Sequence, residues 1–225
     1  MPTIAFASSK GGCGKSTASV LLACELARSG ASVTLVDADP NQPVARWGSL
    51  PGRPDKLAVI GGITEETLLD TVDAAATRTA FVIIDLEGSA SLMIAQAMSR
   101  SDLVIIPVKG SVLDGNEAIK AIRFLQRQER AYHRAIPYRV LISQTNPAVR
   151  PRTLKALESE LLEQQVPMFG TALNDRDAYR AVFAFGGTIY DLDPAKVGGL
   201  AGAVQNVRAL TSEVVSTLKM AAEAA

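Results

Sequence analysis

The chain has 225 residues, of which 48% are hydrophobic and 20% charged, with 23 basic and 23 acidic side chains. This length suits one α/β domain with a sizeable core, assigned here to residues 1–225. Because the net charge is zero, attraction of the whole molecule to nucleic acid is excluded, and any such contact needs a local basic surface. The sequence has no CxxC spacing, no basic leader and no apolar run of about 18 residues. We therefore expect a cytoplasmic protein with no membrane partner.

Apolar β-prone runs alternate with helical periods along the chain. Several of the runs are apolar on both faces, as in parallel strands covered by helices on each side. The sequence therefore predicts an α/β fold with a doubly wound, mostly parallel sheet and ligands at the carboxyl ends of the strands. The expected strands are 3–8, 32–37, 57–61, 80–85, 103–108, 138–143 and 167–173; the expected helices are 15–29, 64–78, 89–99, 114–132, 151–164, 175–185 and 200–222; and 40–56 is expected to be a long loop with a short helix.

The first expected strand leads into the segment ASSKGGCGKSTAS, residues 7–19, just before the first helix. Its glycines, Gly11, Gly12 and Gly14, let the backbone curl so that several amides point inward, with Cys13 at the free position between them. These amides and the positive end of the helix form an anion site. A glycine-rich turn that happens to precede a lysine is the simpler alternative, which the flanking strand and helix disfavour.

The side chains that follow these glycines suit a magnesium nucleotide. Lys15 can reach the β- and γ-phosphates, the Ser16 hydroxyl can ligate Mg²⁺, and Thr17 can bind a neighbouring phosphate. The predicted ligands are therefore ATP and Mg²⁺.

The loop departs from the usual Walker A pattern, which has glycine where this chain has Ser9. It has an additional lysine instead, Lys10. The segment KGGCGKST resembles the ParA/MinD family of deviant Walker ATPases, whose pattern K-G-G-x-G-K-[ST] it matches at every fixed position. The resemblance implies a P-loop NTPase fold, and a homodimer that sandwiches the nucleotides while Lys10 reaches the partner's phosphates. From the residues alone, a solvated loop lysine is the simpler interpretation.

Three carboxylates follow expected strands. Asp37 and Asp39 in LVDADP can both face the phosphates, although D-x-D-P is also a turn pattern. The resemblance implies that Asp37 contacts the Mg²⁺ shell and that Asp39 positions the attacking water. Asp85, after FVII, fits a Walker B aspartate that holds Mg²⁺ through water; a helix-capping aspartate is the alternative. Relatives often have proline soon after this aspartate. Here Glu87 follows, and we expect it to point away from the γ-phosphate.

The resemblance covers nearly the whole chain and is greatest to small ParA proteins of the ParF-like plasmid partition type, through DADPNQPVARW, SDLVIIPV and TALNDRDAYRAVFAFGGTIYD. We expect no N-terminal helix-turn-helix, because the P-loop begins by residue 10. The tail lacks the basic, bulky amphipathic helix of the membrane-binding MinD branch. The CxxC of the iron–sulfur branch and the C-terminal tyrosine cluster of the kinase branch are also missing. Asn146 and Pro147 occupy the positions where relatives hold the adenine base.

Partition ATPases of this type bind DNA without sequence preference, which needs a basic surface. Residues 117–155 carry nine Lys or Arg against two Glu. Four of the arginines recur three or four residues apart, as a stripe on one helix face, although a solvated face is the alternative. The predicted DNA contacts are Arg123, Arg127, Arg130, Arg134, Arg150, Arg152, Arg176 and Arg180.

The resemblance therefore implies a weak Mg²⁺-dependent ATPase with catalytic residues Lys10, Lys15 and Asp39. Its ATP-bound homodimer would bind non-specific double-stranded DNA on the nucleoid and a ParB-like adaptor, and hydrolysis would release both, driving segregation of plasmid or chromosome DNA. Three alternatives remain open. They are a ParA-like ATPase that positions a protein cargo such as a chemoreceptor cluster or carboxysome, a VirC1-like DNA transfer factor, and a nucleotide-sensing scaffold with little hydrolysis.

Overall fold

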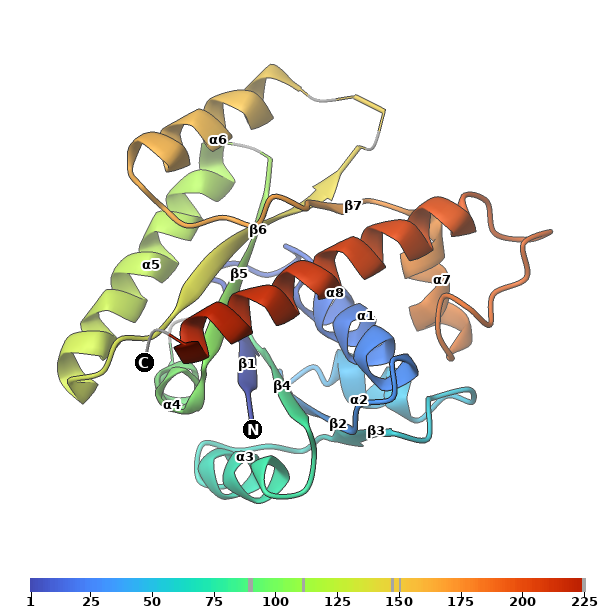
Figure 1. Cartoon of the computed structure of the whole chain (residues 1–225), viewed down its shortest axis with the longest axis horizontal. Coiled ribbons are helices and arrows are strands. Elements are labelled where there is room, and N and C mark those ends of the chain that lie inside the picture. Colours follow the sequence, from blue (N-terminus) through green and yellow to red (C-terminus); the bar gives the residue numbers. More distant parts are fainter. Residues whose placement is uncertain (89–90, 111, 147, 150, 224–225) are drawn as a thin grey trace.

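A computed structural model describes residues 1–88, 91–110, 112–146, 148–149 and 151–223. Its centre is a seven-stranded sheet in the order β3-β2-β4-β1-β5-β6-β7, in which every pair of neighbours is parallel (Figure 1). This confirms the predicted parallel α/β fold. The strands are β1 (Thr3–Phe6), β2 (Val33–Ala38), β3 (Leu57–Ile60), β4 (Phe81–Leu86), β5 (Leu103–Lys109), β6 (Tyr138–Thr145) and β7 (Leu173–Asn174).

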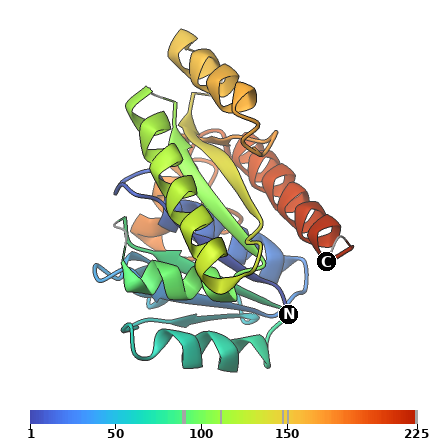
Figure 2. The same cartoon turned by 90° about the vertical axis from the view of Figure 1, so that its left-hand side faces the viewer.

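Helices cover both faces of the sheet, as β1 shows at the centre of the molecule. Ile4 and Phe6 pack into one apolar layer, whereas Ala5 and Ala7 pack into the other, because successive strand residues point to opposite faces. Figure 2 shows α5 and α8 on opposite sides of the sheet. The first layer holds α1 (Lys15–Arg28), α2 (Pro43–Gly48), α7 (Asp177–Phe185) and α8 (Leu200–Glu223); the second holds α3 (Leu68–Ala76), α4 (Leu92–Arg100), α5 (Val112–Tyr132) and α6 (Arg152–Glu163).

The last strand is much shorter than predicted. Of the expected strand 167–173, Met168 makes an isolated bridge to Val140, and β7 itself has two residues. The reason is a carboxylate on α8. Glu213 accepts hydrogen bonds from the backbone amides of Gly170 (2.6 Å) and Thr171 (2.9 Å), so these amides are directed toward α8.

Two other segments adjust the predicted boundaries. The helix expected from residue 64 begins at Leu68, because Thr67 Oγ1 accepts a hydrogen bond from the Thr64 amide (3.0 Å) and closes a turn there. The short helix expected within 40–56 is α2, and its Trp47 is buried with its indole N–H on the Gly187 carbonyl (3.2 Å). Among the described helices, none is both long and apolar enough to cross a bilayer.

Candidate functional site

The loop between β1 and α1 has the backbone geometry of an anion site. Gly12 and Gly14 have φ angles of 76° and 90°, in the left-handed region that glycine adopts at low cost. Gly14 is also the N-cap of α1, where no side chain caps the helix and the first turn contains no acidic residue. The first amides of α1 and its positive dipole end are therefore left for a negatively charged ligand.

The end of β6 holds this loop in place. The Ser143 hydroxyl donates to the Cys13 carbonyl (2.7 Å), and the Gln144 side-chain Nε2 donates to the Gly12 carbonyl (2.9 Å). Sequence reasoning missed both residues. The available signal was the polar pair at the end of an apolar strand, which marks the ligand-binding edge of a parallel sheet.

The loop after β4 touches the P-loop at Gly88. A Cβ atom on Gly88 would lie 2.6 Å from the Gly11 nitrogen and 2.7 Å from the Lys10 carbonyl carbon, so no larger residue fits there without a backbone shift. This contact explains why glycine follows Glu87 in this chain.

A cavity of about 490 Å³ lies over the loop. Glu87, which we expected to point away from the γ-phosphate, is one of the residues at the edge of this cavity. The lining residues are Gly11, Gly12, Gly14, Lys15, Ser16, Thr17, Asp39, Asn41, Glu87, Gly88 and Gln144.

The two lysines of the loop lie in different environments. Lys15 is 6% exposed, and its ammonium is 3.5 Å from the Lys10 carbonyl oxygen, so it lies over the loop. The Lys10 residue is exposed. Lys15 therefore lies within the cavity over the loop, and Lys10 lies at the surface.

Asp85 is a buried carboxylate without a hydrogen-bond partner. It is 0% exposed, and both oxygens lack a partner among the described residues. Burial raises its pKa to about 7, although nearby Ser16 and Lys15 oppose this shift. A buried polar group left unpaired is costly, so such a group commonly marks a ligand site.

Asp37 lies opposite Asp85 in the β2–β4 register, but unlike Asp85 it has hydrogen-bond partners. Its oxygens accept the backbone amides of Ala45 (2.7 Å) and Asp39 (3.2 Å), and burial raises the pKa of this carboxyl group. In this structure Asp37 therefore holds the loop that follows β2. It positions Asp39, whose carboxylate accepts from the Asn41 amide (2.8 Å) and also lines the cavity.

These residues fit Mg²⁺ as part of a nucleotide complex. No group of three or more His, Cys, Asp or Glu that could hold a metal alone occurs in the described part of the chain. Mg²⁺ in nucleotide sites takes one or two protein ligands and completes its shell with phosphate oxygens and water. The Ser16 hydroxyl and the unpaired Asp85 carboxylate supply such ligands.

A second cavity of about 430 Å³ adjoins the first and shares Gly14, Thr17 and Gln144 with it. Asn146 is not among the described residues that line either cavity. Its side-chain oxygen accepts the Ala148 amide (2.8 Å), and Pro147 lies outside the described residues. The other lining residues of the second cavity are Ser143, Leu173, Asn174, Asp175, Arg176, Tyr179, Arg180 and Phe183.

Arg176 and Arg180, two of the predicted DNA contacts, line this second cavity. Arg176 is half-buried, with its Nε atom unpaired, and Arg180 forms ion pairs with Asp175 and with Asp177 (3.5 Å). The structure therefore places both arginines beside the nucleotide site and apart from the arginines of α5.

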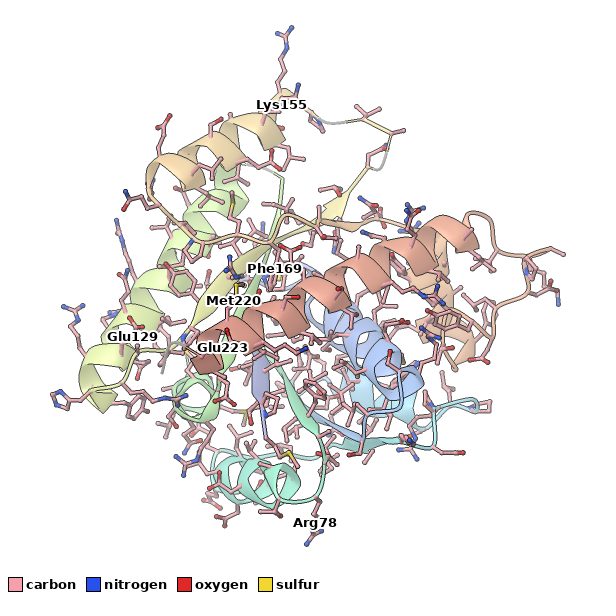
Figure 3. The ribbon with its side chains drawn as sticks, viewed as in Figure 1. Arg78, Glu129, Lys155, Phe169, Met220 and Glu223 are labelled. Atoms are coloured by element: carbon pink, nitrogen blue, oxygen red, sulfur yellow. The ribbon has the colours of Figure 1, made fainter. Side chains whose placement is uncertain are left out.

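Three of the four arginines predicted to form a basic stripe lie on α5. Arg123, Arg127 and Arg130 are exposed, opposite the buried Leu125. None of the three forms an ion pair with a described side chain. On the neighbouring helix Arg152 is exposed, and Figure 3 shows Lys155 extending away from the body of the molecule. Arg150 lies outside the described residues.

Arg134 does not belong to this stripe, so that part of the prediction is wrong. The helix ends at Tyr132, and His133 has a φ of 51°, which turns the chain away. The Arg134 guanidinium donates to the backbone oxygens of Ser99 and Ser101, each at 2.7 Å, and thereby joins the α5–β6 loop to the end of α4.

We therefore expect Arg134→Ala to lower the free energy of unfolding by about 1–3 kcal/mol, since two backbone carbonyls lose a charged donor. If the protein binds DNA, that binding should change less in Arg134→Ala than in Arg127→Ala, because the Arg134 guanidinium is already held by the Ser99 and Ser101 carbonyls. Urea unfolding and DNA titration of both variants test this assignment. A large loss of DNA affinity with unchanged stability in Arg134→Ala would contradict it.

The whole chain resembles known proteins of one family. Residues 1–218 match the model of the VirC1 protein family. A protein named ParA from Rhizobium radiobacter is 34% identical, over 97% of this chain and 98% of the relative. Maintenance of carboxysome distribution protein A from Halothiobacillus neapolitanus is 28% identical, over 84% of this chain and 87% of that protein.

Solved structures share the fold. An ATP complex of a variant of Cyanothece McdA superposes with a TM-score of 0.78, at 16% identity, over 95% of this chain and 96% of that one. The VirC1 family match and the 34% identical ParA relative, together with the KGGCGKST segment, establish the family. The chain therefore belongs to the ParA/MinD family of P-loop ATPases. Within that family it matches the VirC1 branch and is close to the small plasmid ParA proteins.

Proposed function

We propose that this protein is a weak Mg²⁺-dependent ATPase of the partition type, which works on the nucleoid as an ATP-bound sandwich homodimer. In that form it binds non-specific double-stranded DNA and a ParB-like adaptor protein, and hydrolysis releases both. The observation that carries the proposal is the buried, unpaired Asp85 carboxylate beside a P-loop whose helix terminus has no side-chain cap.

Each residue of the site has a role in this proposal. The amides from Gly11 to Thr17 bind the phosphates, and Lys15 neutralises charge on them. Ser16 and Asp85 hold Mg²⁺, which when bound neutralises charge on the β- and γ-phosphates. The second cavity receives the base and sugar.

Hydrolysis in this proposal depends on Asp39 and Lys10. Asp37 fixes the loop through the Ala45 and Asp39 amides, and Asp39 is one of the residues that line the cavity. In this proposal its carboxylate orients the attacking water. Lys10 is exposed and crosses to the phosphates of the partner subunit. Because the site is shared between two chains, hydrolysis depends on dimerisation, and its slow rate sets the lifetime of the ATP-bound dimer.

The proposed DNA surface consists of Arg123, Arg127 and Arg130 on α5 with Arg152 on α6. Exposed guanidinium groups without ion-pair partners are free to neutralise DNA phosphates, and this releases condensed counterions. Arg176 and Arg180 are not included, because they line the second cavity and Arg180 already pairs with two aspartates.

The test is DNA binding with ATP, with ADP and without nucleotide across a salt series. We expect binding with ATP, with affinity falling steeply as salt rises, because each phosphate contact contributes about −0.9 to the slope of log K against log salt. Arg127→Ala should reduce that slope by about one for each protomer that contacts DNA. Glu163→Gln, which changes an exposed α6 charge, is the control. Absence of binding in every nucleotide state would refute the DNA part of the proposal.

A second candidate is a protein of the same ATPase type that positions a protein cargo. It is favoured by the similarity to a relative whose name refers to carboxysome distribution. Retained ATP hydrolysis and ATP-dependent dimerisation without any DNA binding would support this candidate. Absence of hydrolysis with retained nucleotide binding would instead favour a nucleotide-sensing scaffold.

A further inference from the structure

The P-loop contacts α5 through Ser9 and Glu117. The Ser9 hydroxyl lies 2.7 Å from Glu117 Oε2 and 2.8 Å from the Glu117 backbone oxygen, so its single proton is held by this one residue of α5. Ser9 is also the position where the usual Walker A pattern has glycine. A glycine there has no hydroxyl, so this link is a property of the chain's own loop. None of the roles proposed above uses it.

On the loop side, the contact adjoins the phosphate-binding lysine. The Lys10 carbonyl oxygen lies 3.5 Å from the Lys15 ammonium and 3.1 Å from the Ser8 hydroxyl, which also accepts the Lys10 amide (3.2 Å). The Lys15 ammonium has three protons, so it can donate to the Lys10 carbonyl and to a bound phosphate together. The main chain at Ser9 and Lys10 would then share a donor with the phosphate.

On the helix side, the contact adjoins the arginines. The other carboxylate oxygen of Glu117 accepts from the Lys120 ammonium (2.7 Å). The ion pair with Lys120 and the hydrogen bond from Ser9 lower the pKa of Glu117, so the carboxylate is ionised near neutral pH. Glu117 belongs to the same continuous helix as Arg123 and Arg127, so a displacement at Glu117 moves their backbone with it.

The start of α5 is also packed closely against α6. A Cβ atom on Gly110 would lie 3.0 Å from Leu154 Cδ1, and one on Gly115 would lie 2.5 Å from Leu157 Cδ1. Contacts this close leave little room for α5 to move without α6. Arg152, at the first turn of α6, is thereby included in any movement that begins at Glu117.

We propose that Ser9 and Glu117 are positioning residues that couple nucleotide occupancy of the P-loop to the placement of the basic surface on α5 and α6. The DNA readout of this inference rests on the proposed function. Coupling between two sites is a free energy, and it changes the affinity of each site by the same factor. Nucleotide should therefore change DNA affinity and DNA should change nucleotide affinity equally, and both changes should shrink when the contact is removed.

The first experiment measures the ratio of DNA affinities with a non-hydrolysable ATP analogue and with ADP. Ser9→Ala and Glu117→Gln should each lower this ratio about fivefold or more, within the usual range of coupling between sites. The double variant should lower it no further, because both changes break one contact. The matched control is Glu163→Gln, which neutralises an exposed carboxylate on α6 and should leave the ratio as in the unmodified protein.

Nucleotide affinity distinguishes coupling from a static support for the loop. In the absence of DNA, Ser9→Ala should bind the analogue within about twofold of the unmodified protein, since neither Ser9 nor Glu117 lines the cavity over the P-loop. If the variant loses nucleotide affinity while the DNA ratio is unchanged, the contact only supports the loop and the inference is overturned. An unchanged ratio in both single variants overturns it as well.

Amide hydrogen exchange of α5 separates this inference from the proposed function. In the unmodified protein, exchange across residues 115–130 should differ between the analogue and ADP, and Ser9→Ala should abolish the difference. If the unmodified protein binds no DNA, the DNA function fails, and the exchange result alone decides the coupling. Identical α5 exchange in both nucleotide states of the unmodified protein would refute it.

Discussion

Asp39→Ala should lower the ATP turnover rate by about a hundredfold or more and leave the protein as a persistent dimer with ATP. The carboxylate lines the cavity over the P-loop, and removing a group that orients or deprotonates the attacking water typically costs 10²–10⁴ in rate. Binding should survive, because the phosphate-binding amides and Lys15 are untouched. Single-turnover phosphate release and size-exclusion chromatography with ATP measure the two effects.

The control for this variant is Asn41→Ala. Asp39 also accepts hydrogen bonds from Asn41, from the backbone amide at 2.8 Å and from the side-chain amide at 3.0 Å. Replacing Asn41 removes the side-chain bond and keeps the carboxylate. If Asn41→Ala loses as much activity as Asp39→Ala, then Asp39 acts by shaping the turn. A monomeric Asp39→Ala protein with ATP would contradict the water-positioning role directly.

Asp85→Asn should have opposite effects on activity and on stability. Mg²⁺-dependent turnover should fall by at least about a hundredfold, because the cation loses its only fully buried carboxylate among the proposed ligands. Without nucleotide and Mg²⁺, however, the variant should gain stability relative to the unmodified protein as the pH rises. The free energy of unfolding of the variant minus that of the unmodified protein should be larger at pH 8 than at pH 5. The reason is that an ionised, unpaired carboxylate is buried in the unmodified protein and absent from the variant.

The pH window follows from the raised pKa of Asp85. Burial raises this pKa from 3.8 to about 7, so between these values the folded state binds more protons at Asp85 than the unfolded state does. The stability that this group contributes is fully present below pH 3.8 and is lost as the pH rises through about 7. The loss approaches about 1.4 kcal/mol for each pH unit inside the window.

Urea unfolding of both proteins across pH 4–8 tests this, with Asp70→Asn as a control on an exposed carboxylate of α3. Asp37 also has a raised pKa, but it is present in both proteins and largely cancels in their difference. Parallel pH profiles for the unmodified protein and Asp85→Asn would show that Asp85 is not a buried, unpaired acid. Added Mg²⁺ and ATP should stabilise the unmodified protein and not the variant, since a ligand stabilises the state that binds it.

The sequence by itself determined the features whose residues are contiguous. The P-loop residues could be proposed from the sequence, because the glycines, Lys15 and Ser16 lie in one short segment, and the structure places that segment between β1 and α1 as expected. Asp85 was predicted because an apolar run ends at it, and strand ends meet at the ligand-binding edge. The parallel sheet was predicted because short apolar runs alternate with segments of helical periodicity, and this pattern is typical of buried strands covered by helices on both faces.

Only the tertiary structure decided which distant residues meet at that edge. Gly88 reaches the P-loop, and Ser143 and Gln144 hold it from β6, because β4 and β6 are brought there by the strand order. The same holds for the bond between Ser9 and Glu117, which are 108 residues apart. The arginines show the limit of a helical period. The spacing predicted Arg134 on the stripe, but α5 ends at Tyr132. The Arg134 guanidinium instead donates to the Ser99 and Ser101 carbonyls, because the fold brings the end of α4 beside the end of α5.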